Sequence, residues 1–269
     1  MRTEAGRAGL AGLLHVPGRA LIALDYDGTL SPIVADPAAA RPRRGAVAAL
    51  RRLAPLTGTL AVITGRPARE AVELGGLAQV PGVIVLGQYG RQRWERGTLT
   101  SPPPPDGVAA ARRELPGVLA AAGAPEGTWT EDKADALAVH TRRAAEPGPA
   151  LERLRGPLAE LGARTGLMVE PGRMVIELRP PGSDKGQTLK SLAAERTASA
   201  VMYCGDDLGD RAAFEAVAQL RGDGIPGLAV CSGSAEVTAL AQLADLVVDG
   251  PGGVVDLLDS LAATMAGEG

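Results

Sequence analysis

Residues 21–30 read L-I-A-L-D-Y-D-G-T-L, a run of apolar residues that leads directly into two aspartates one residue apart. The run Leu21–Leu24 is typical of a strand buried on both faces, as in the centre of a parallel sheet. Asp25 follows at the end of this strand, and Gly28 allows a tight turn. In open α/β sheets, ligands bind at this end of the strands. The stretch predicts a parallel sheet with an acidic site at its carboxyl edge.

The pair Asp25 and Asp27 admits two interpretations. Two neighbouring carboxylates repel each other, which raises a pKa or calls for a cation. Asp and Gly also dominate surface turns, and D-x-D-G can begin a calcium loop. Leu30 and Pro32 stand where a calcium loop needs further oxygen ligands. From these residues alone, a plain turn and a cation site both remain open.

Composition limits the class of protein. The chain has 269 residues, 45% of them hydrophobic, which is enough for one large domain or two modest ones. A net charge of −3 and no basic stripe interleaved with aromatics argue against a nucleic-acid partner. We expect no membrane segment and no signal peptide. Cys204 and Cys231 have no metal-site spacing, so we expect reduced, buried thiols in a cytoplasmic protein.

Apolar strands alternate with amphipathic helices in the outer parts of the chain. Strands are expected within residues 21–24, 59–66, 83–87, 200–207, 228–231 and 246–248. Helices are expected around Val47–Ala54, Leu189–Ala193, Phe214–Val217 and Val254–Leu261. This alternation predicts an α/β fold, a doubly wound, Rossmann-like parallel sheet with helices on both faces.

The middle of the chain has a different pattern. Residues 101–105 read S-P-P-P-P, a stiff stretch that cannot enter a sheet interior. Pro116 and Pro157 should kink or break the helices expected near 107–122 and 150–162. Strand-like pieces lie at 128–131, 136–141 and 174–179. We therefore expect an α+β domain at 88–179, inserted between two parts of the sheet domain, 1–87 and 180–269.

Polar residues at strand ends and helix starts combine into a phosphoryl-transfer site. A carboxylate can attack phosphorus, and a neighbouring acid can protonate the departing oxygen and then activate water. Mg2+ shared by Asp25 and Asp206 would offset the repulsion between the nucleophile and a phosphate dianion. Lys185 would add positive charge, and Thr64 a hydroxyl donor. Each of these motifs alone is also typical of a turn or a helix start. Their order along the chain, each at a predicted strand end or helix start, favours the combined site.

These segments resemble the four signatures of the haloacid dehalogenase-like phosphohydrolases. D-Y-D-G-T-L matches D-x-D-x-T, which implies that Asp25 is the nucleophile and Asp27 the acid/base, whose main-chain carbonyl also ligates Mg2+. Thr64 and Lys185 match the second and third signatures. Asp206 and Asp210 match the acidic fourth, with Asp210 either supporting the metal ligands from behind or reaching the metal through water. The resemblance implies a haloacid dehalogenase core whose insertion is a cap that selects the substrate.

Charged groups on the strand-like pieces of the insertion suit a hydroxyl-rich ligand, although an exposed sheet face with ion pairs would look similar. The insertion also resembles the cap of the trehalose-6-phosphate phosphatases, through E-D-K at 131–133, H-x-R at 140–142 and V-I-E-L-R-P at 175–180. T-G-R at 64–66 and G-Q-Y-G at 87–90 add to this resemblance. It implies that three residues bind the distal glucose, and two arginines help to place the sugar phosphate. They are Glu131, Lys133 and Glu177, and Arg66 and Arg142.

The expected function is Mg2+-dependent hydrolysis of trehalose 6-phosphate to trehalose and phosphate through an aspartyl-phosphate, as the last step of trehalose biosynthesis. We expect a separate trehalose-6-phosphate synthase, because the chain has no room for a fused glycosyltransferase. The alternatives are a phosphatase of another sugar or glycosyl phosphate, a phosphomutase, and a non-catalytic sugar-phosphate sensor. The family usually has Thr or Asn where this chain has Gly209, which puts one hydrogen bond of the acidic signature in doubt.

Overall fold

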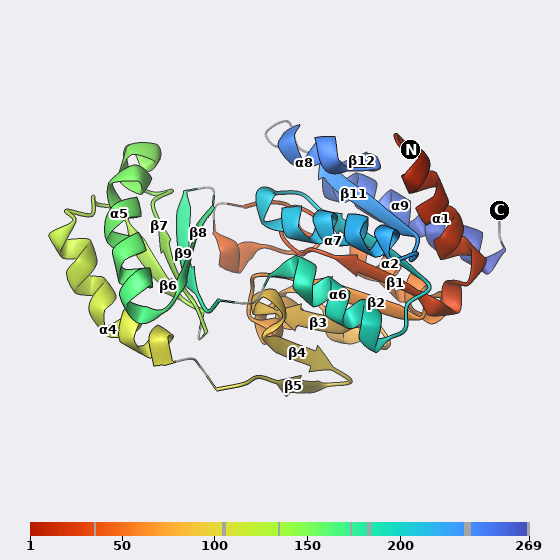
Figure 1. The fold of residues 1–269 in the computed structure, drawn as a ribbon, viewed down its shortest axis with the longest axis horizontal. Coiled ribbons are helices and arrows are strands. Elements are labelled where there is room, and N and C mark those ends of the chain that lie inside the picture. The colour runs from red at the N-terminus through yellow and green to blue at the C-terminus, as the bar shows by residue number, and fades with distance from the viewer. Residues whose placement is uncertain are drawn as a thin grey trace. The chain divides into compact units, whose positions relative to one another are not determined.

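The chain forms two compact units (Figure 1). The structure is a computed structural model that describes residues 1–34, 36–103, 106–133, 135–172, 174–181, 184–233 and 238–267. Met1–Ser101 and Asp184–Gly269 form the sheet unit, and Pro102–Ser183 form the inserted unit. Pro104 and Pro105 of the expected stiff stretch lie outside the described residues.

The sheet unit contains an eight-stranded sheet in the order β12-β11-β10-β1-β2-β3-β4-β5. Neighbouring strands from β12 to β3 pair in parallel, and β4 and β5 continue the sheet in antiparallel fashion. The strands are β1 (Ala20–Leu24), β2 (Thr59–Ile63), β3 (Ile84–Gly87), β4 (Gln92–Glu95), β5 (Thr98–Thr100), β10 (Ala200–Gly205), β11 (Gly227–Gly233) and β12 (Leu246–Asp249). Strand β1 therefore lies inside the sheet, between β10 and β2.

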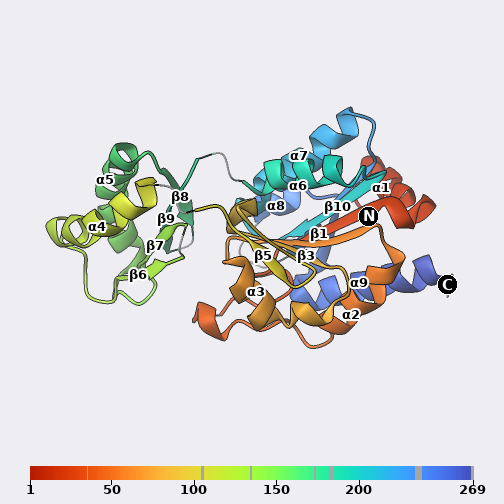
Figure 2. The same ribbon diagram turned by 90° about the horizontal axis from the view of Figure 1, so that it is seen from below.

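Helices cover both faces of this sheet, as Figure 2 shows. One face packs against α2 (Ala46–Leu53), α3 (Ala68–Gly75) and α9 (Gly250–Ala266), and the other against α6 (Lys185–Glu195), α7 (Arg211–Gly222) and α8 (Thr238–Leu243). Helix α1 (Glu4–His15) packs along β10 and β11. Ile22 and Leu24 of β1 join the first core, and Leu21 and Ala23 join the second. The apolar run is continuous because both faces of the strand are buried, and the predicted doubly wound α/β fold is confirmed.

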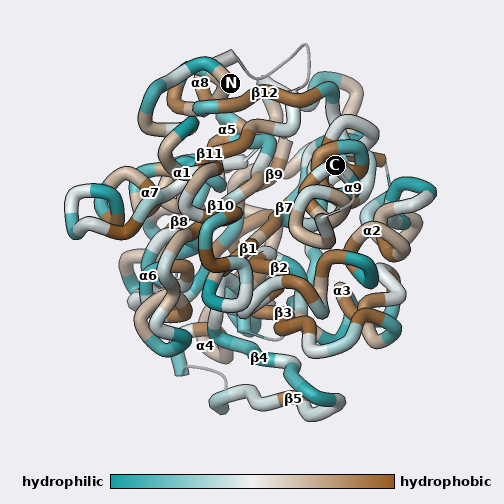
Figure 3. Tube along the Cα trace, turned by 90° about the vertical axis from the view of Figure 1, so that its right-hand side faces the viewer, coloured by the Kyte–Doolittle hydropathy of each residue, from teal (hydrophilic) through white to brown (hydrophobic). Residues whose placement is uncertain are grey.

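The hairpin of β4 and β5 places the boundary between the units further along the chain than the sequence suggested. Arg96 and Gly97 connect the two strands with positive φ angles of 52° and 81°, the conformation that a two-residue hairpin turn needs. In Figure 3 the tube of β1 and β3 is mainly brown, whereas β4 and β5 are mainly white and teal. These polar edge strands do not have the apolar signature of the buried strands. The predicted boundary at residue 88 thus falls within the sheet unit, which continues to Ser101.

The inserted unit is a four-stranded antiparallel sheet in the order β6-β7-β9-β8, with two helices packed on one face. Its elements are α4 (Asp106–Ala121), β6 (Trp129–Asp132), β7 (Leu137–His140), α5 (Pro147–Thr165), β8 (Met168–Gly172) and β9 (Val175–Arg179). Leu137 and Val139 of β7, with Ile176 and Leu178 of β9, form the core against these helices. Alternate residues of the same strands therefore make the opposite, polar face of the sheet.

The sequence predicts a kink or a break at Pro116 and Pro157, but helices α4 and α5 each continue through their proline, so neither helix breaks there. A proline removes one intrahelical hydrogen bond, to the carbonyl group four residues earlier. Pro116 is exposed and Pro157 is half-buried, so water can reach the side of the helix where that bond is lost. Buried leucines on both helices, such as Leu115 of α4 and Leu154 of α5, hold them to the sheet. Among the helices of the described ranges, none is long and apolar enough to cross a bilayer.

Candidate active site

The candidate site lies where β1 and β10 end. These strands are parallel neighbours, so the residues that follow them meet at one edge of the sheet. Asp25 follows β1, and its backbone N–H donates to the carbonyl group of Cys204 at 2.8 Å. Asp206 follows β10. Gly28 has a φ of 76°, and a Cβ atom there would lie 1.9 Å from Oδ2 of Asp206, so only glycine lets the two loops approach this closely.

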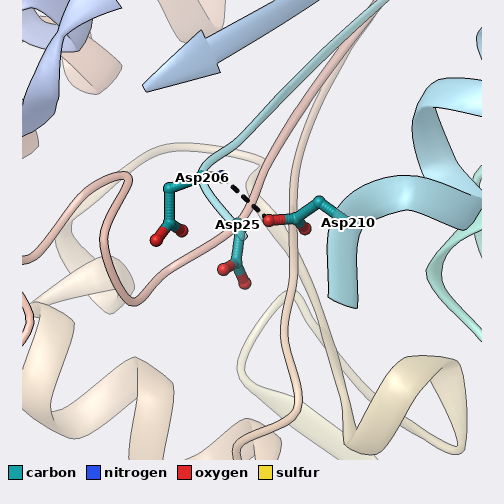
Figure 4. Close-up of side chains that lie close together, drawn as sticks. All are labelled: Asp25, Asp206 and Asp210. Atoms are coloured by element: carbon teal, nitrogen blue, oxygen red, sulfur yellow. Dashed lines mark hydrogen bonds between the residues drawn. The ribbon is translucent and has the colours of Figure 1, made fainter. Parts of the chain in front are cut away.

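Three carboxyl groups gather at this edge, as predicted from the sequence. One oxygen atom each from Asp25, Asp206 and Asp210 lies within 4.8 Å of the others (Figure 4). All three side chains are buried. Thr29 donates a long hydrogen bond of 3.4 Å to Oδ1 of Asp206. Clustered carboxylate oxygens at the carboxyl edge of a parallel sheet fit a hard divalent cation such as Mg2+.

The carboxylate of Asp210 is already occupied by four donors. Its Oδ1 accepts from Nζ of Lys185 at 2.7 Å and from the hydroxyl group of Tyr203 at 2.6 Å. Its Oδ2 accepts from the backbone N–H groups of Asp206 at 2.9 Å and Asp207 at 3.3 Å, the first drawn as a dashed line in Figure 4. These bonds fix the loop that carries Asp206. Asp210 therefore organises the site, and a direct bond to a cation would compete with these four donors.

Lys185 is the first residue of α6, with its side chain directed into the acidic cluster. Nζ lies 2.9 Å from Oδ1 of Asp25 and 2.7 Å from Oδ1 of Asp210. Asp184 caps the helix by accepting from the backbone N–H of Gln187 at 2.7 Å, which fixes where Lys185 starts. Burial lowers the pKa of Lys185, but Asp210 and Asp25 outweigh burial and raise it well above its usual value. The side chain remains an ammonium group beside Asp25.

Burial is also the largest influence on the pKa values of Asp25 and Asp206. It raises the pKa of Asp25 well above its usual value, although Lys185 counteracts this. Burial, followed by repulsion from Asp25 and Asp210, raises the pKa of Asp206 from 3.8 to about 9. Fully ionised, the three carboxylates would carry more negative charge than one ammonium group can balance. A bound divalent cation would favour the ionised carboxylates and so release protons.

Asp27 lies apart from this cluster and pairs with Arg66, which follows β2. Nε and Nη2 of Arg66 each donate to one carboxylate oxygen of Asp27 at 2.7 Å, and Nη1 donates to Glu70. Thr64 is buried at the end of β2, and its hydroxyl group accepts from the backbone N–H of Arg66 at 3.2 Å. The two predicted residues Thr64 and Asp27 are thus linked through Arg66.

Most of the predicted sugar-binding residues lie on the polar face of the inserted unit. The register of the sheet aligns Glu131, Ala138 and Glu177 across β6, β7 and β9. Nζ of Lys133 lies 2.9 Å from Oε2 of Glu177. Arg142 lies in the turn after β7. Carboxylates and an ammonium group on one small face can accept from and donate to hydroxyl groups.

His140 adds a contact to this face that the sequence did not predict. Its Nε2 lies 2.8 Å from Oε2 of Glu131, and its ring stacks on Trp129 with centroids 4.5 Å apart. Arg143 lies over the same indole ring at 4.4 Å. The sequence gives one signal for this arrangement: Trp129 and Glu131 lie two residues apart on a strand and so share a face. The stack restrains the orientation of Glu131 through His140.

The model of the family described as trehalose-phosphatase matches residues 23–247 of the chain. The protein belongs to the trehalose-phosphatase family. It is 35% identical over 270 residues to the trehalose-phosphate phosphatase of Mycobacterium marinum (strain ATCC BAA-535 / M), in a match that covers 94% of this chain and 64% of the relative. The chain thus spans a little under two thirds of the length of that relative.

Solved structures support the same trehalose-phosphatase fold. The C-terminal domain of a Candida protein, described as C. albicans trehalose-6-phosphate phosphatase, superposes with a TM-score of 0.78 at 23% identity and covers 97% of both chains. A haloacid dehalogenase-like hydrolase from Bacteroides thetaiotaomicron gives a TM-score of 0.63 at 18% identity, covering 90% of this chain and 99% of that one. The predicted haloacid dehalogenase-like architecture is confirmed.

Gly209 is where this member of the trehalose-phosphatase family departs from the expected acidic signature. Its backbone N–H donates to Oδ1 of Asp207 at 2.8 Å, within a capping box formed by Asp207 and Asp210. Asp210 receives its donors from Lys185, Tyr203 and the loop backbone, none of which needs a side chain at position 209. The loop therefore keeps its shape without a hydroxyl or amide at this position.

Proposed function

We propose that the protein is a Mg2+-dependent phosphatase that converts trehalose 6-phosphate to trehalose and phosphate. The observation that carries this proposal is the buried carboxylate of Asp25, 2.9 Å from the ammonium group of Lys185 and beside Asp206, in a chain of the trehalose-phosphatase family. A carboxylate held by a fixed cation at the open edge of a sheet is suited to attack a phosphorus atom.

In the proposed reaction, an oxygen atom of Asp25 forms a bond to phosphorus while the bond from phosphorus to the sugar oxygen breaks. Asp27 donates a proton to that oxygen, and trehalose leaves. Asp27 then takes a proton from a water molecule, whose oxygen attacks the aspartyl-phosphate and releases phosphate. Lys185 and the hydroxyl group of Thr64 stabilise the negative charge on the transferring group.

The acidic cluster fits the metal that this reaction needs. Asp25 and Asp206, with the main-chain carbonyl group of Asp27, would hold Mg2+, and Asp210 would act through water or through its bonds to Lys185 and the Asp206 loop. Mg2+ supplies charge that offsets the repulsion between the attacking carboxylate and the phosphate dianion.

We assign the choice of substrate to the polar face of the inserted unit. Glu131, Lys133 and Glu177 would bind sugar hydroxyl groups, with Arg142 and Arg66 helping to place the sugar phosphate. The ion pair between Lys133 and Glu177 and the contact between His140 and Glu131 support this role, because they hold polar groups in fixed positions on one face. We expect a separate synthase to supply the phosphorylated disaccharide.

Phosphate release from a panel of esters tests the proposal. The panel is trehalose 6-phosphate, sucrose 6-phosphate, glucose 6-phosphate and p-nitrophenyl phosphate, each with Mg2+ and with EDTA. We expect Mg2+-dependent turnover with strong preference for trehalose 6-phosphate. Preference for another sugar phosphate would contradict the assigned substrate and leave the core chemistry standing. A folded protein that releases phosphate from none of the four would refute the proposed enzyme and favour a sugar-phosphate sensor.

A further inference from the structure

Arg66 is held from several sides in the sheet unit. Its Nε and Nη2 face Asp27, while Nη1 donates to Oε1 of Glu70 at 2.5 Å. Its guanidinium carbon also lies 5.4 Å from the ring centroid of Tyr26. The Arg66 side chain is only 9% exposed, whereas those of Asp27 and Glu70 are 39% and 36% exposed. The contacts together restrict the guanidinium group to one orientation.

Glu70 holds the Nη1 end of the Arg66 guanidinium group, the end that does not donate to Asp27. It lies four residues after Arg66, in the first turn of α3. Without Glu70, Nη1 would lose its carboxylate acceptor, and the guanidinium plane would be less restrained against rotation about the long side chain. A rotated plane cannot donate two parallel hydrogen bonds to Asp27. Glu70 thus restrains Asp27 through Arg66, and in the part of the chain that the structure describes its own carboxylate makes no hydrogen bond with Asp27.

We propose that Glu70 is a positioning residue for the acid/base step, because it orients Arg66 and thereby the carboxylate of Asp27. This inference rests on the proposed function, in which Asp27 must reach the oxygen that leaves phosphorus. A small misplacement of an acid/base group lowers the rate of proton transfer more than it lowers substrate affinity. The loss of rate on replacing Glu70 should therefore be larger for substrates whose leaving oxygen depends more on protonation.

A purely structural role would look different. A glutamate in the first turn of a helix also stabilises the helix dipole, typically by about 0.3–1 kcal/mol, and such a role would affect all substrates equally. Glu73 is an exposed glutamate of the same helix and provides the matched control. The variants are Glu70→Ala, Glu70→Gln, Glu70→Asp and Glu73→Ala. Glu70→Asp keeps the charge in the first turn but shortens the reach to Arg66.

The experiment measures kcat/KM for p-nitrophenyl phosphate, phenyl phosphate and trehalose 6-phosphate, because kcat/KM reports the steps up to release of the alcohol. p-Nitrophenolate leaves with little protonation, while phenolate and a sugar alkoxide need it more. Glu70→Ala and Glu70→Asp should lower kcat/KM about tenfold on trehalose 6-phosphate, less on phenyl phosphate and under about twofold on p-nitrophenyl phosphate. Glu70→Gln should retain most activity, since its amide oxygen can accept from Nη1, and Glu73→Ala should match the wild type.

Equal losses on all three esters, or no loss on any, would overturn the proposal. A loss on trehalose 6-phosphate with equal rates on the two aryl esters would instead assign Glu70 to sugar binding and also overturn it. If the wild type cleaves both aryl esters but not trehalose 6-phosphate, the proposed substrate fails, and the ratio of the two aryl esters still decides the role of Glu70. A wild type that cleaves none of them would refute both proposals.

Discussion

Replacing Asp206 with asparagine should remove a pH dependence of stability that the acidic cluster creates. The pKa of Asp206 is about 9 in the fold against an ordinary value of 3.8. Between these values the folded protein holds a proton that the unfolded chain has released, so the free energy of unfolding falls as pH rises. One such proton lowers it by about 1.4 kcal/mol per pH unit, or about 3 kcal/mol from about pH 6 to about pH 8.

For a chain of this length, that loss corresponds to a fall in Tm of roughly 5–10 °C. The assay is thermal unfolding followed by circular dichroism in EDTA, comparing the wild type with Asp206→Asn across this pH range. All groups outside position 206 are common to both proteins, so the difference between the two Tm curves isolates the cluster. The variant should show a clearly shallower decline with pH.

Mg2+ provides the second arm of this test. Because the cation binds ionised carboxylates, it competes with protons, and its affinity should rise with pH. Adding Mg2+ should therefore raise the Tm of the wild type more at about pH 8 than at about pH 6, and should do little for Asp206→Asn. Identical slopes for the two proteins in EDTA, or a Tm that rises with pH only in the wild type, would refute the reasoning.

Three further substitutions test other parts of the site. Asp25→Asn should abolish turnover while leaving the fold and substrate binding largely intact, as measured by phosphate release and calorimetry; a rate near that of the wild type would contradict its role as nucleophile. Glu131→Ala should reduce activity on trehalose 6-phosphate far more than on p-nitrophenyl phosphate, with the exposed Glu160→Ala as control, and equal losses would argue against sugar binding. Gly28→Ala should destabilise the fold by about 1–3 kcal/mol and weaken Mg2+ binding, because a Cβ at this positive φ would meet the Asp206 carboxylate; unchanged urea unfolding and Mg2+ titrations would count against the proposed close approach.

The sheet core could be predicted from the sequence because a strand buried on both faces needs a continuous run of apolar residues, and such a run is visible without a structure. The run before Asp25 and the strand before Asp206 are apolar throughout because both faces of each strand are covered in the parallel sheet. Once those strands are neighbours, their carboxyl ends must share an edge, so the acidic cluster follows from topology. Lys185 was predicted as a site residue because a lysine at a helix start opposes the helix dipole and so needs another explanation.

The remaining features depend on contacts that a linear pattern does not contain. Tyr203 lies in an apolar strand and reads as a core residue, yet its hydroxyl group donates to Asp210. In the sequence, Glu70 looks like an ordinary surface residue of a helix. Only the fold shows that it pairs with the buried side chain of Arg66. The hairpin before Ser101 is short and polar, so it resembles a linker. Pro116 suggested a helix break because the sequence does not show that it faces water.

The chain passes between the sheet unit and the inserted unit only twice, after Ser101 and before Asp184. Both passages fall outside the strands of the eight-stranded sheet, and the second is followed at once by the cap of α6 and by Lys185. Replacement of residues 102–183 by a different insertion would interrupt none of the strands or helices that hold the acidic cluster. Recombination at these two points could therefore exchange the inserted unit, to which we assign the choice of substrate, as a whole, and mutations that diversify it could accumulate without disturbing the residues of the acidic cluster.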